Sequence, residues 1–186
     1  MPESAASLHL VYHASRARLG RRRLALVTGQ SEMVVRTEIE RLRDRGLLRI
    51  ERSGVALTDA GTARFVGLLQ PVKQVCELEL SSLRLGDVAL AALVAVSERS
   101  AVWELRDLAV RGGATGLLLL SREAQNWCFA HDQEPIAIRN PQDAAAIDRT
   151  CPSVSDEDRL VIAFGPTRGR AGQGLWAVLA EMLSDR

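Results

Sequence analysis

Residues 42–61 decide the fold of the first part of the chain, and they read LRDRGLLRIERSGVALTDAG. Gly46 follows a helical pattern and can adopt the left-handed conformation that ends many helices. Apolar and polar residues then alternate on both sides of a Ser-Gly turn, which predicts a short β-hairpin. The sequence TDAG at 58–61 begins another helix, which we expect to continue to about Leu69 and to stop before Pro71.

Three further helices are predicted upstream of this hairpin. The first, at about residues 4–14, has apolar residues three and four positions apart. The second covers about residues 20–28 and is broken by the sequence Thr-Gly-Gln. The third covers about residues 32–45, with Ser31 as its N-cap. Its core-facing side is predicted to carry Val35, Ile39 and Leu42.

The order of these elements is helix, helix, glycine turn, helix and hairpin, which is the plan of a winged helix-turn-helix. The cadence L-x-x-x-G-L-L, hairpin, L-T-x-x-G, carried by residues 42–48 and 57–61, resembles that of many prokaryotic winged-helix regulators. The resemblance implies a DNA-binding domain over residues 1–70. The alternative is a small helical bundle with a hairpin on its surface.

The winged-helix plan predicts which residues face DNA. In such domains the N-terminal residues of the recognition helix meet base edges in the major groove. Arg36 is suited to a bidentate contact with guanine, and Val34 offers methyl groups to a thymine methyl. Arginines at the start of the second helix are expected to contact phosphates, and those on the hairpin to reach the minor groove. The predicted DNA-binding residues are Arg21, Arg22, Arg23, Ser31, Val34, Arg36, Thr37, Arg41, Arg49 and Arg52.

The charge distribution both supports and limits this prediction. Residues 1–70 hold twelve arginines against seven acidic residues, whereas residues 71–186 hold twelve basic residues against sixteen acidic ones. This asymmetry favours a polyanionic partner for the first half alone. Three glutamates, however, lie on or near the recognition helix, so the affinity of a single copy for DNA is expected to be modest. They are Glu32, Glu38 and Glu40.

Composition excludes several classes of protein. Apolar residues make up 47% of the 186 residues, which is typical of a globular chain and not of a disordered one. The longest aliphatic run, Val88–Val96, is far shorter than the ~20 residues of a membrane span. The first residues do not resemble a signal peptide, and three dispersed cysteines do not make a disulfide framework. We therefore expect a cytoplasmic protein.

The second half of the chain, residues 71–186, is predicted to form a separate domain. Strands are predicted at 75–80, 88–96, 117–120 and 160–164, with 127–130 as the hairpin partner of the third. Helices are predicted at about 101–111, 141–149 and 174–183. The fold class is therefore α+β, with an N-terminal winged helix-turn-helix domain followed by a small α+β sandwich domain.

A motif in this second half resembles an archaeal family. Residues 103–116 read WELRDLAVRGGATG, which is similar to the R-D-x-A-x-x-x-G-A-x-G segment of a family of uncharacterised winged-helix proteins. The strand at 158–162 and the glycine- and alanine-rich last helix match the same family, so the resemblance spans nearly the whole chain. The family is described as transcriptional regulators with a C-terminal domain of unknown function. The resemblance implies the architecture and adds little chemistry.

Two weaker candidate sites lie in the second half. Arg106 and Asp107 are adjacent on their helix and lie away from its apolar side. They could bind a ligand or form a dimer contact. The alternative is a charge pair that ties the helix to the neighbouring sheet. Residues 164–174 predict a strand, a glycine-rich turn and then a helix, whose start would favour anions. The residues of this candidate anion site are Arg168, Gly169 and Arg170. The alternative is a turn whose glycines only allow close packing.

Patterns for metal or catalytic chemistry are absent from the sequence. His9, His13, His131 and the cysteines lack metal-site spacing, and there is no nucleophile elbow or paired base. We therefore expect no metal, no cofactor and no catalytic residue.

The leading hypothesis is a DNA-binding transcriptional regulator whose second domain, residues 71–186, forms a homodimer or senses a small-molecule or anionic effector. Its partners would be double-stranded DNA and a second copy of the chain, with no membrane. One alternative is a small metabolic enzyme with an autoregulatory winged helix. Another is a winged helix used for protein contacts. The placement of the arginines favours the regulator.

Overall fold

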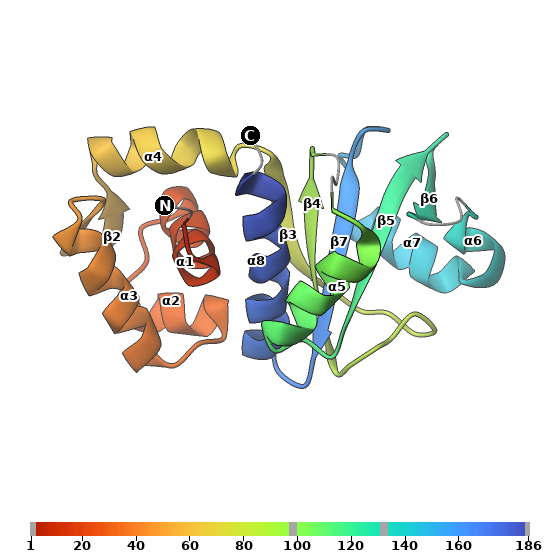
Figure 1. Ribbon diagram of the computed structural model, residues 1–186, viewed down its shortest axis with the longest axis horizontal. Coiled ribbons are helices and arrows are strands. Elements are labelled where there is room, and N and C mark those ends of the chain that lie inside the picture. Colours follow the sequence, from red (N-terminus) through yellow and green to blue (C-terminus); the bar gives the residue numbers. More distant parts are fainter. Residues whose placement is uncertain (1–2, 97–99, 131–133, 185–186) are drawn as a thin grey trace. The chain divides into compact units, whose positions relative to one another are not determined.

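The computed structural model describes residues 3–96, 100–130 and 134–184, and the chain divides into two compact units (Figure 1). The N-terminal unit is Met1–Gln70 and the C-terminal unit is Pro71–Arg186. The predicted α+β class, a winged helix-turn-helix followed by an α+β domain, is confirmed. Within the described residues, no helix is long and apolar enough to cross a membrane.

The N-terminal unit has the element order of a winged helix. Its elements are α1 (Ala5–Arg16), α2 (Arg21–Thr28), α3 (Glu32–Asp44), β1 (Leu48–Glu51), β2 (Gly54–Leu57) and α4 (Asp59–Leu69). The turn between α2 and α3 passes through Gly29, whose φ of 66° favours glycine. Ser31 is the N-cap of α3, as predicted, because its side chain accepts a hydrogen bond from the backbone nitrogen of Val34 at 3.3 Å.

Apolar side chains from all four helices, α1 to α4, form the core of this unit. Leu24, Val35, Leu42 and Phe65 are fully buried, and Ile39 is nearly so. Burial of each such side chain contributes about 1.5–3 kcal/mol. Helices as short as these are marginal in isolation, so packing of their apolar faces accounts for most of their stability.

The junction between the hairpin and α4 is tightly packed. The Thr58 side chain accepts a hydrogen bond from the backbone nitrogen of Gly61 (3.0 Å) and donates one to the carbonyl oxygen of Gly46 (2.6 Å). A Cβ atom built on Gly61 would lie 2.0 Å from the carbonyl oxygen of Leu47. Glycine at this position therefore lets α4 begin directly against the hairpin, which explains the last residue of the TDAG sequence.

The C-terminal unit is built on an antiparallel sheet with the strand order β3-β4-β7-β5-β6. The strands are β3 (Val72–Leu78), β4 (Val88–Val94), β5 (Gly116–Glu123), β6 (Asn126–Phe129) and β7 (Arg159–Gly165). The last strand in the chain, β7, lies between β4 and β5, where Leu160 is opposite both Leu93 and Leu120. All five predicted strands are present, although β3 begins earlier than predicted.

Helices cover both faces of this sheet (Figure 1). On one face, α5 (Val102–Arg111) and α8 (Arg168–Ser184) pack against each other and against β4, β5 and β7. On the other, α6 (Ile136–Arg139) contacts β6 and α7 (Pro141–Thr150) contacts β3. Alternate residues of β7, namely Leu160, Ile162 and Phe164, join the core beneath α6 and α7. The short helix α6 was not predicted.

The last helix begins six residues earlier than the predicted start at 174. Because α8 starts at Arg168, the predicted glycine-rich turn is wrong: Gly169, Gly172 and Gly174 lie inside α8, and Gly165 is the last residue of β7. A Cβ atom on Gly112 would meet the Cα atom of Gly174 at 3.0 Å, and one on Gly174 would lie 2.5 Å from the Cβ atom of Ala114. Close packing of α8 against the end of α5 thus outweighs the low helix propensity of glycine.

A buried carboxylate fastens the connection between β3 and β4 to α7. Asp143 is 1% exposed and accepts hydrogen bonds from the backbone nitrogens of Ser81 (2.6 Å), Ser82 (2.9 Å) and Leu83 (2.7 Å). Both serine hydroxyls also donate to it. Burial alone would raise the pKa of Asp143, but these hydrogen bonds outweigh it and hold that pKa below its usual value.

Candidate nucleic-acid interface

Helix α3, the predicted recognition helix, is exposed on the side away from its core residues. The core-facing residues are those predicted, Val35, Ile39 and Leu42. The residues predicted to face DNA are all exposed, namely Ser31, Val34, Arg36, Thr37 and Arg41. They do not all point the same way, because Arg36 lies beside the wing whereas Arg41 bonds to α1.

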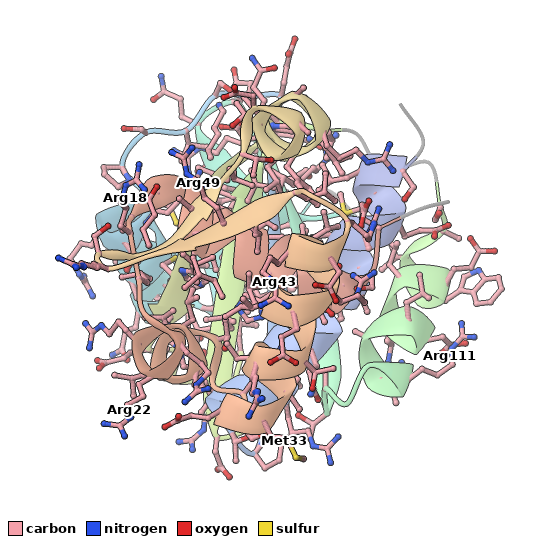
Figure 2. The ribbon with its side chains drawn as sticks, turned by 90° about the vertical axis from the view of Figure 1, so that its left-hand side faces the viewer. Arg18, Arg22, Met33, Arg43, Arg49 and Arg111 are labelled. Atoms are coloured by element: carbon pink, nitrogen blue, oxygen red, sulfur yellow. The ribbon has the colours of Figure 1, made fainter. Side chains whose placement is uncertain are left out.

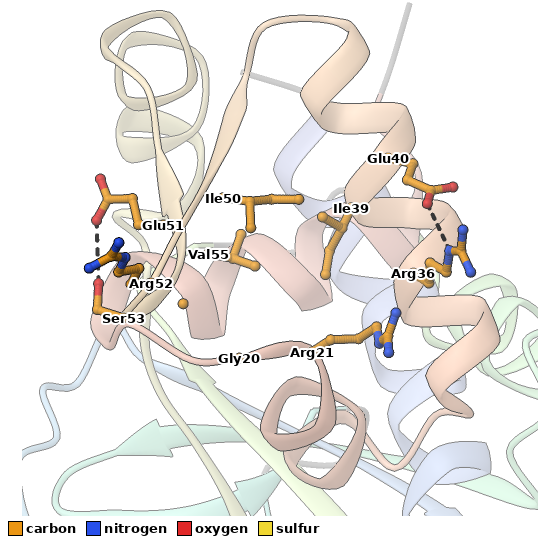
Figure 3. Close-up of a pocket in the computed structure, with 11 residues that line it drawn as sticks. Gly20, Arg21, Arg36, Ile39, Glu40, Ile50, Glu51, Arg52, Ser53 and Val55 are labelled. Atoms are coloured by element: carbon orange, nitrogen blue, oxygen red, sulfur yellow. Dashed lines mark hydrogen bonds and ion pairs between the residues drawn. The ribbon is translucent and has the colours of Figure 1, made fainter.

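A groove of about 290 Å³ runs between α3 and the wing, which is the hairpin β1–β2. Ile39, Ile50 and Val55 form its apolar floor. Figure 3 shows Arg21 and Arg36 on one side of this floor and Arg52 on the other. The lining also includes the carboxylates of Glu40 and Glu51. The groove therefore combines an apolar surface with three guanidinium groups and two carboxylates, and its excess of positive charge suits a ligand with anionic edges.

Arg36 is oriented by a glutamate one helical turn further along α3. Its Nε donates a hydrogen bond to Glu40 at 2.8 Å, and this bond raises the pKa of Arg36 above its ordinary value. The two terminal nitrogens make no hydrogen bond to any described residue. Arg36 is therefore held in position while its terminal nitrogens remain available to a ligand.

Arg41 is exposed on α3, as its spacing predicts, but its guanidinium bonds to α1. Its guanidinium donates to Glu38 at 2.6 Å and also bonds the hydroxyl of Ser7 in α1. Burial raises the pKa of Glu38, but the hydrogen bonds from Arg41 and Ser7 outweigh this effect and keep that pKa below its usual value. Arg45 holds Glu3 in a similar way, at 2.8 Å. These contacts connect α3 to α1 and its preceding residues, and they direct the guanidinium of Arg41 towards α1.

The start of α2 carries three exposed arginines in succession, Arg21, Arg22 and Arg23. Arg21 and Arg22 lie 3.6 and 3.7 Å from the carboxylate of Glu32 at the start of α3. Arg23 has no carboxylate partner among the described residues. The first backbone N–H groups of α2 have no partner within the helix, so positive charge and unpaired donors meet at this corner, where a phosphate is favoured.

The wing carries two arginines in different settings. Arg49 lies 2.7 Å from Glu51, which also pairs with Arg18. Arg52, in the turn of the hairpin, has no carboxylate partner in the part of the chain that the structure describes. Arg52 is therefore the uncompensated charge at the tip of the wing.

Met33 is an exposed residue of α3 that the sequence analysis did not identify. It lies in the first turn of α3 and is 74% exposed. Figure 2 shows Met33 and Arg22 projecting outward from α3 and α2, with Arg43 further along α3. Helical periodicity would have found Met33, because it lies roughly 200° around the helix from Val35.

The candidate residues of the second half lie on two different helices. Arg106 and Asp107 are exposed on α5, and no ion pair ties them to the sheet within the described residues. Arg168, at the start of α8, is 2.6 Å from Glu77 of β3, and Gly169 is buried. An anion bound here would therefore compete with Glu77.

A metal site is not apparent among the described residues, where no three His, Cys, Asp or Glu residues gather as ligands. His131 lies outside the described residues.

Comparisons with known proteins give the chain a family. Residues 8–72 match the model of the CggR N-terminal DNA binding domain. The chain is also similar to the solved structure of the hypothetical protein PH0730 from Pyrococcus horikoshii OT3, with 20% sequence identity and a TM-score of 0.77 over 99% of this chain and 95% of that one. At that identity the likeness concerns the fold alone. No curated protein matches. Residues 85–182, more than half of the chain, match the model of the domain of unknown function DUF4443, and the chain therefore belongs to that family.

Proposed function

We propose that the protein is a transcriptional regulator that binds double-stranded DNA through α3, the start of α2 and the wing. The observation that carries the proposal is the groove between α3 and the wing, with Arg21, Arg36 and Arg52 around its apolar floor. This groove lies in the unit that matches a DNA-binding domain. A regulator of this kind would work in the cytoplasm, where its DNA lies.

The residues divide by task in this proposal. Arg36 contacts a guanine edge, and Met33 and Val34 meet thymine methyl groups in the major groove. Arg21, Arg22 and Arg23 contact phosphates and set the register of the domain. Arg52 of the wing follows the backbone towards the adjacent minor groove. Arg41 positions α3 through Glu38 and Ser7 and does not itself contact a base.

Substitution of arginines should separate base recognition from phosphate contacts. We expect Arg36→Ala to cost about 1–3 kcal/mol on the preferred duplex and to relax the preference at one base pair. Arg22→Ala should weaken all duplexes alike and reduce the slope of log K against log salt by about 1. The measurement is fluorescence anisotropy at several salt concentrations, with a duplex selected from a random library and a scrambled duplex.

Arg139→Ala is the matched control, because it removes the same charge from an exposed position on α6 in the other unit. It should leave binding unchanged. Equal and uniform losses for Arg36→Ala and Arg22→Ala would show that the assignment of the DNA-facing side of α3 is wrong. If the wild-type protein bound no duplex at about 50 mM salt, where phosphate contacts are strong, the proposed function itself would fail.

The proposal includes a homodimer, assembled through the C-terminal unit. One winged helix reads a short site, and two-fold dimers gain specificity by reading two half-sites. The outer side of α5 supports this arrangement, because Trp103 is 65% and Val110 47% exposed. Together with Arg106 and Asp107 they follow the spacing of one helix face.

The order of these four residues suits contact with a second copy of the chain. In an antiparallel pair of α5 helices, a two-fold axis between positions 106 and 107 places Trp103 against the partner's Val110. The same axis places Arg106 against the partner's Asp107, and it does so twice. Such a surface pairs apolar with apolar residues and positive with negative charges, as a self-complementary isologous interface requires.

A charge-swap experiment tests this dimer. Arg106→Asp places aspartates against each other, and Asp107→Arg places arginines against each other, so each should weaken dimerisation at least about tenfold. The double variant Arg106→Asp with Asp107→Arg restores both pairs and should dimerise like the wild type. Sedimentation equilibrium at micromolar concentrations measures all four proteins. A monomeric wild type, or a double variant no better than the single ones, would refute the proposed interface.

A further inference from the structure

The fold brings together two cysteines that lie 75 residues apart in the sequence. Cys76 is on the edge strand β3, and Cys151 directly follows α7. Their Sγ atoms are 4.0 Å apart, and no disulfide joins them. The third cysteine, Cys128, is buried on β6. The dispersed spacing of the cysteines does not predict this pair, which arises because the end of α7 packs on β3.

A hydrogen bond between the two elements lies beside the sulfur pair. The side chain of Gln74, two residues before Cys76, donates a hydrogen bond to the carbonyl oxygen of Thr150 at 2.9 Å. This bond ties the end of α7 to β3 immediately beside the cysteine pair. Cys151 is buried, whereas Cys76 is partly exposed. Cys76 is therefore the more accessible residue of the pair.

The contact between the sulfurs couples their ionisation. The hydrogen bond between them, together with burial, raises the pKa of Cys76, and the same bond lowers the pKa of Cys151. The pair therefore loses a first proton far more readily than a second, and the remaining proton is shared between the two sulfurs. The singly ionised pair supplies a thiolate, which is the form of cysteine that reacts with oxidants.

We propose that Cys76 and Cys151 form an oxidation site at which hydrogen peroxide converts two thiols into one intramolecular disulfide. First, the shared proton passes to the sulfur of Cys151, and the sulfur of Cys76, now the thiolate, attacks one peroxide oxygen. The O–O bond breaks, and the released hydroxide takes up the proton that the pair had given to solvent. Then the sulfur of Cys151 attacks that of Cys76, and the S–O bond of the sulfenic acid breaks. The departing hydroxide takes the proton of Cys151, so one peroxide has been reduced to two waters.

The geometry suits this reaction. A disulfide bond is about 2.05 Å long, so the sulfurs, which are 4.0 Å apart, have to approach each other by about 2 Å. The bond would close a loop of 75 residues within the C-terminal unit, and cross-links that close long loops restrict the unfolded chain most. A role in packing alone, which is common for buried thiols, predicts no response to peroxide.

Counting free thiols in the full-length protein tests the proposal. The protein is reduced, freed of reductant, treated with hydrogen peroxide, denatured and alkylated with N-ethylmaleimide. Mass spectrometry should find three adducts before peroxide, one for each cysteine. After peroxide it should find one, on Cys128, with the peptides of Cys76 and Cys151 joined. The oxidised protein should also unfold at a temperature several degrees higher.

Two variants complete the experiment. Cys128→Ser is the matched control and should still lose two adducts on oxidation. Cys76→Ser, at a partly exposed position on an edge strand, should keep both remaining thiols and show no rise in unfolding temperature. Retention of all three thiols in the wild type after peroxide overturns the proposal. So does sulfinic acid on a single cysteine without a cross-link, or a disulfide between two chains.

Discussion

Replacement of Gly61 with alanine should lower the free energy of unfolding of the N-terminal unit by about 3 kcal/mol or more, because it overpacks a site that cannot relax. The new Cβ atom would lie 2.0 Å from the carbonyl oxygen of Leu47 and 3.0 Å from its carbonyl carbon. That oxygen also accepts a hydrogen bond from the backbone nitrogen of Thr58. Since the clash is with backbone atoms, the start of α4 has to move away from the hairpin.

Gly67→Ala is the matched control for this prediction, since Gly67 is an exposed position of the same helix with nothing within 4 Å of the new Cβ atom. The higher helix propensity of alanine should stabilise this variant by up to about 1 kcal/mol. Urea unfolding measures the stability of both variants, followed by far-ultraviolet circular dichroism, which reports on both units, and by tryptophan fluorescence. All three tryptophans lie in the C-terminal unit, so fluorescence identifies the transition of that unit and distinguishes it from that of the N-terminal unit. Equal stabilities of the two variants would contradict the close approach at Gly61.

Replacement of Asp143 with asparagine should destabilise the C-terminal unit by about 3 kcal/mol, since hydrogen bonds to charged groups are each worth about 1.5–3 kcal/mol. Three backbone nitrogens and two hydroxyls converge on this carboxylate. The asparagine side chain offers one acceptor oxygen in place of two. Its NH₂ group is a hydrogen-bond donor, and it would face the backbone N–H and hydroxyl groups that now donate to the carboxylate. Urea unfolding followed by tryptophan fluorescence measures the loss directly.

The pH dependence of the same variant gives a second readout. Because hydrogen bonds hold the pKa of Asp143 below its usual value in the folded state, its contribution to stability is complete above the ordinary pKa and is lost as pH falls through the folded one. Below about pH 4, the wild type should therefore lose stability more steeply than Asp143→Asn.

Asp148→Asn serves as the control on the same helix. Asp148 is half-exposed and bonds Arg122 and the indole nitrogen of Trp127. An exposed pair of this kind contributes less than about 1 kcal/mol. If both variants lost the same stability, the buried carboxylate would not have the role assigned to it.

Periodicity predicted the recognition helix and the sheet because burial follows a regular spacing in both. The apolar positions of α3 and the apolar runs of β4 and β7 are buried as their spacing requires. The start of α8 was mispredicted because intrinsic propensity argues against helix at Gly169 and Gly172, whereas both are buried residues within α8. Ile50 alternates like a buried strand residue, yet it is exposed and forms part of the groove floor.

The site was predictable in its elements and less so in its individual contacts. The arginines of α2, α3 and the wing are exposed where the winged-helix plan placed them. The sequence does not distinguish Arg36, beside the groove, from Arg41, which bonds to α1, since that depends on where Ser7 and Glu38 lie in three dimensions. Contacts between residues more than thirty positions apart leave no periodic pattern in the chain.

The central position of β7 bears on how the protein is made on the ribosome. The N-terminal unit and the hairpins β3–β4 and β5–β6 are all synthesised before β7 emerges. Until then, the inner edges of β4 and β5 have no partner, and unpaired edges are prone to pair with other chains. The last strand, β7, then pairs with β4 and β5 together, so it completes the sheet and gives both inner edges a partner. A nascent chain that stalls before residue 159 would carry a finished winged helix attached to an unfinished, association-prone second domain.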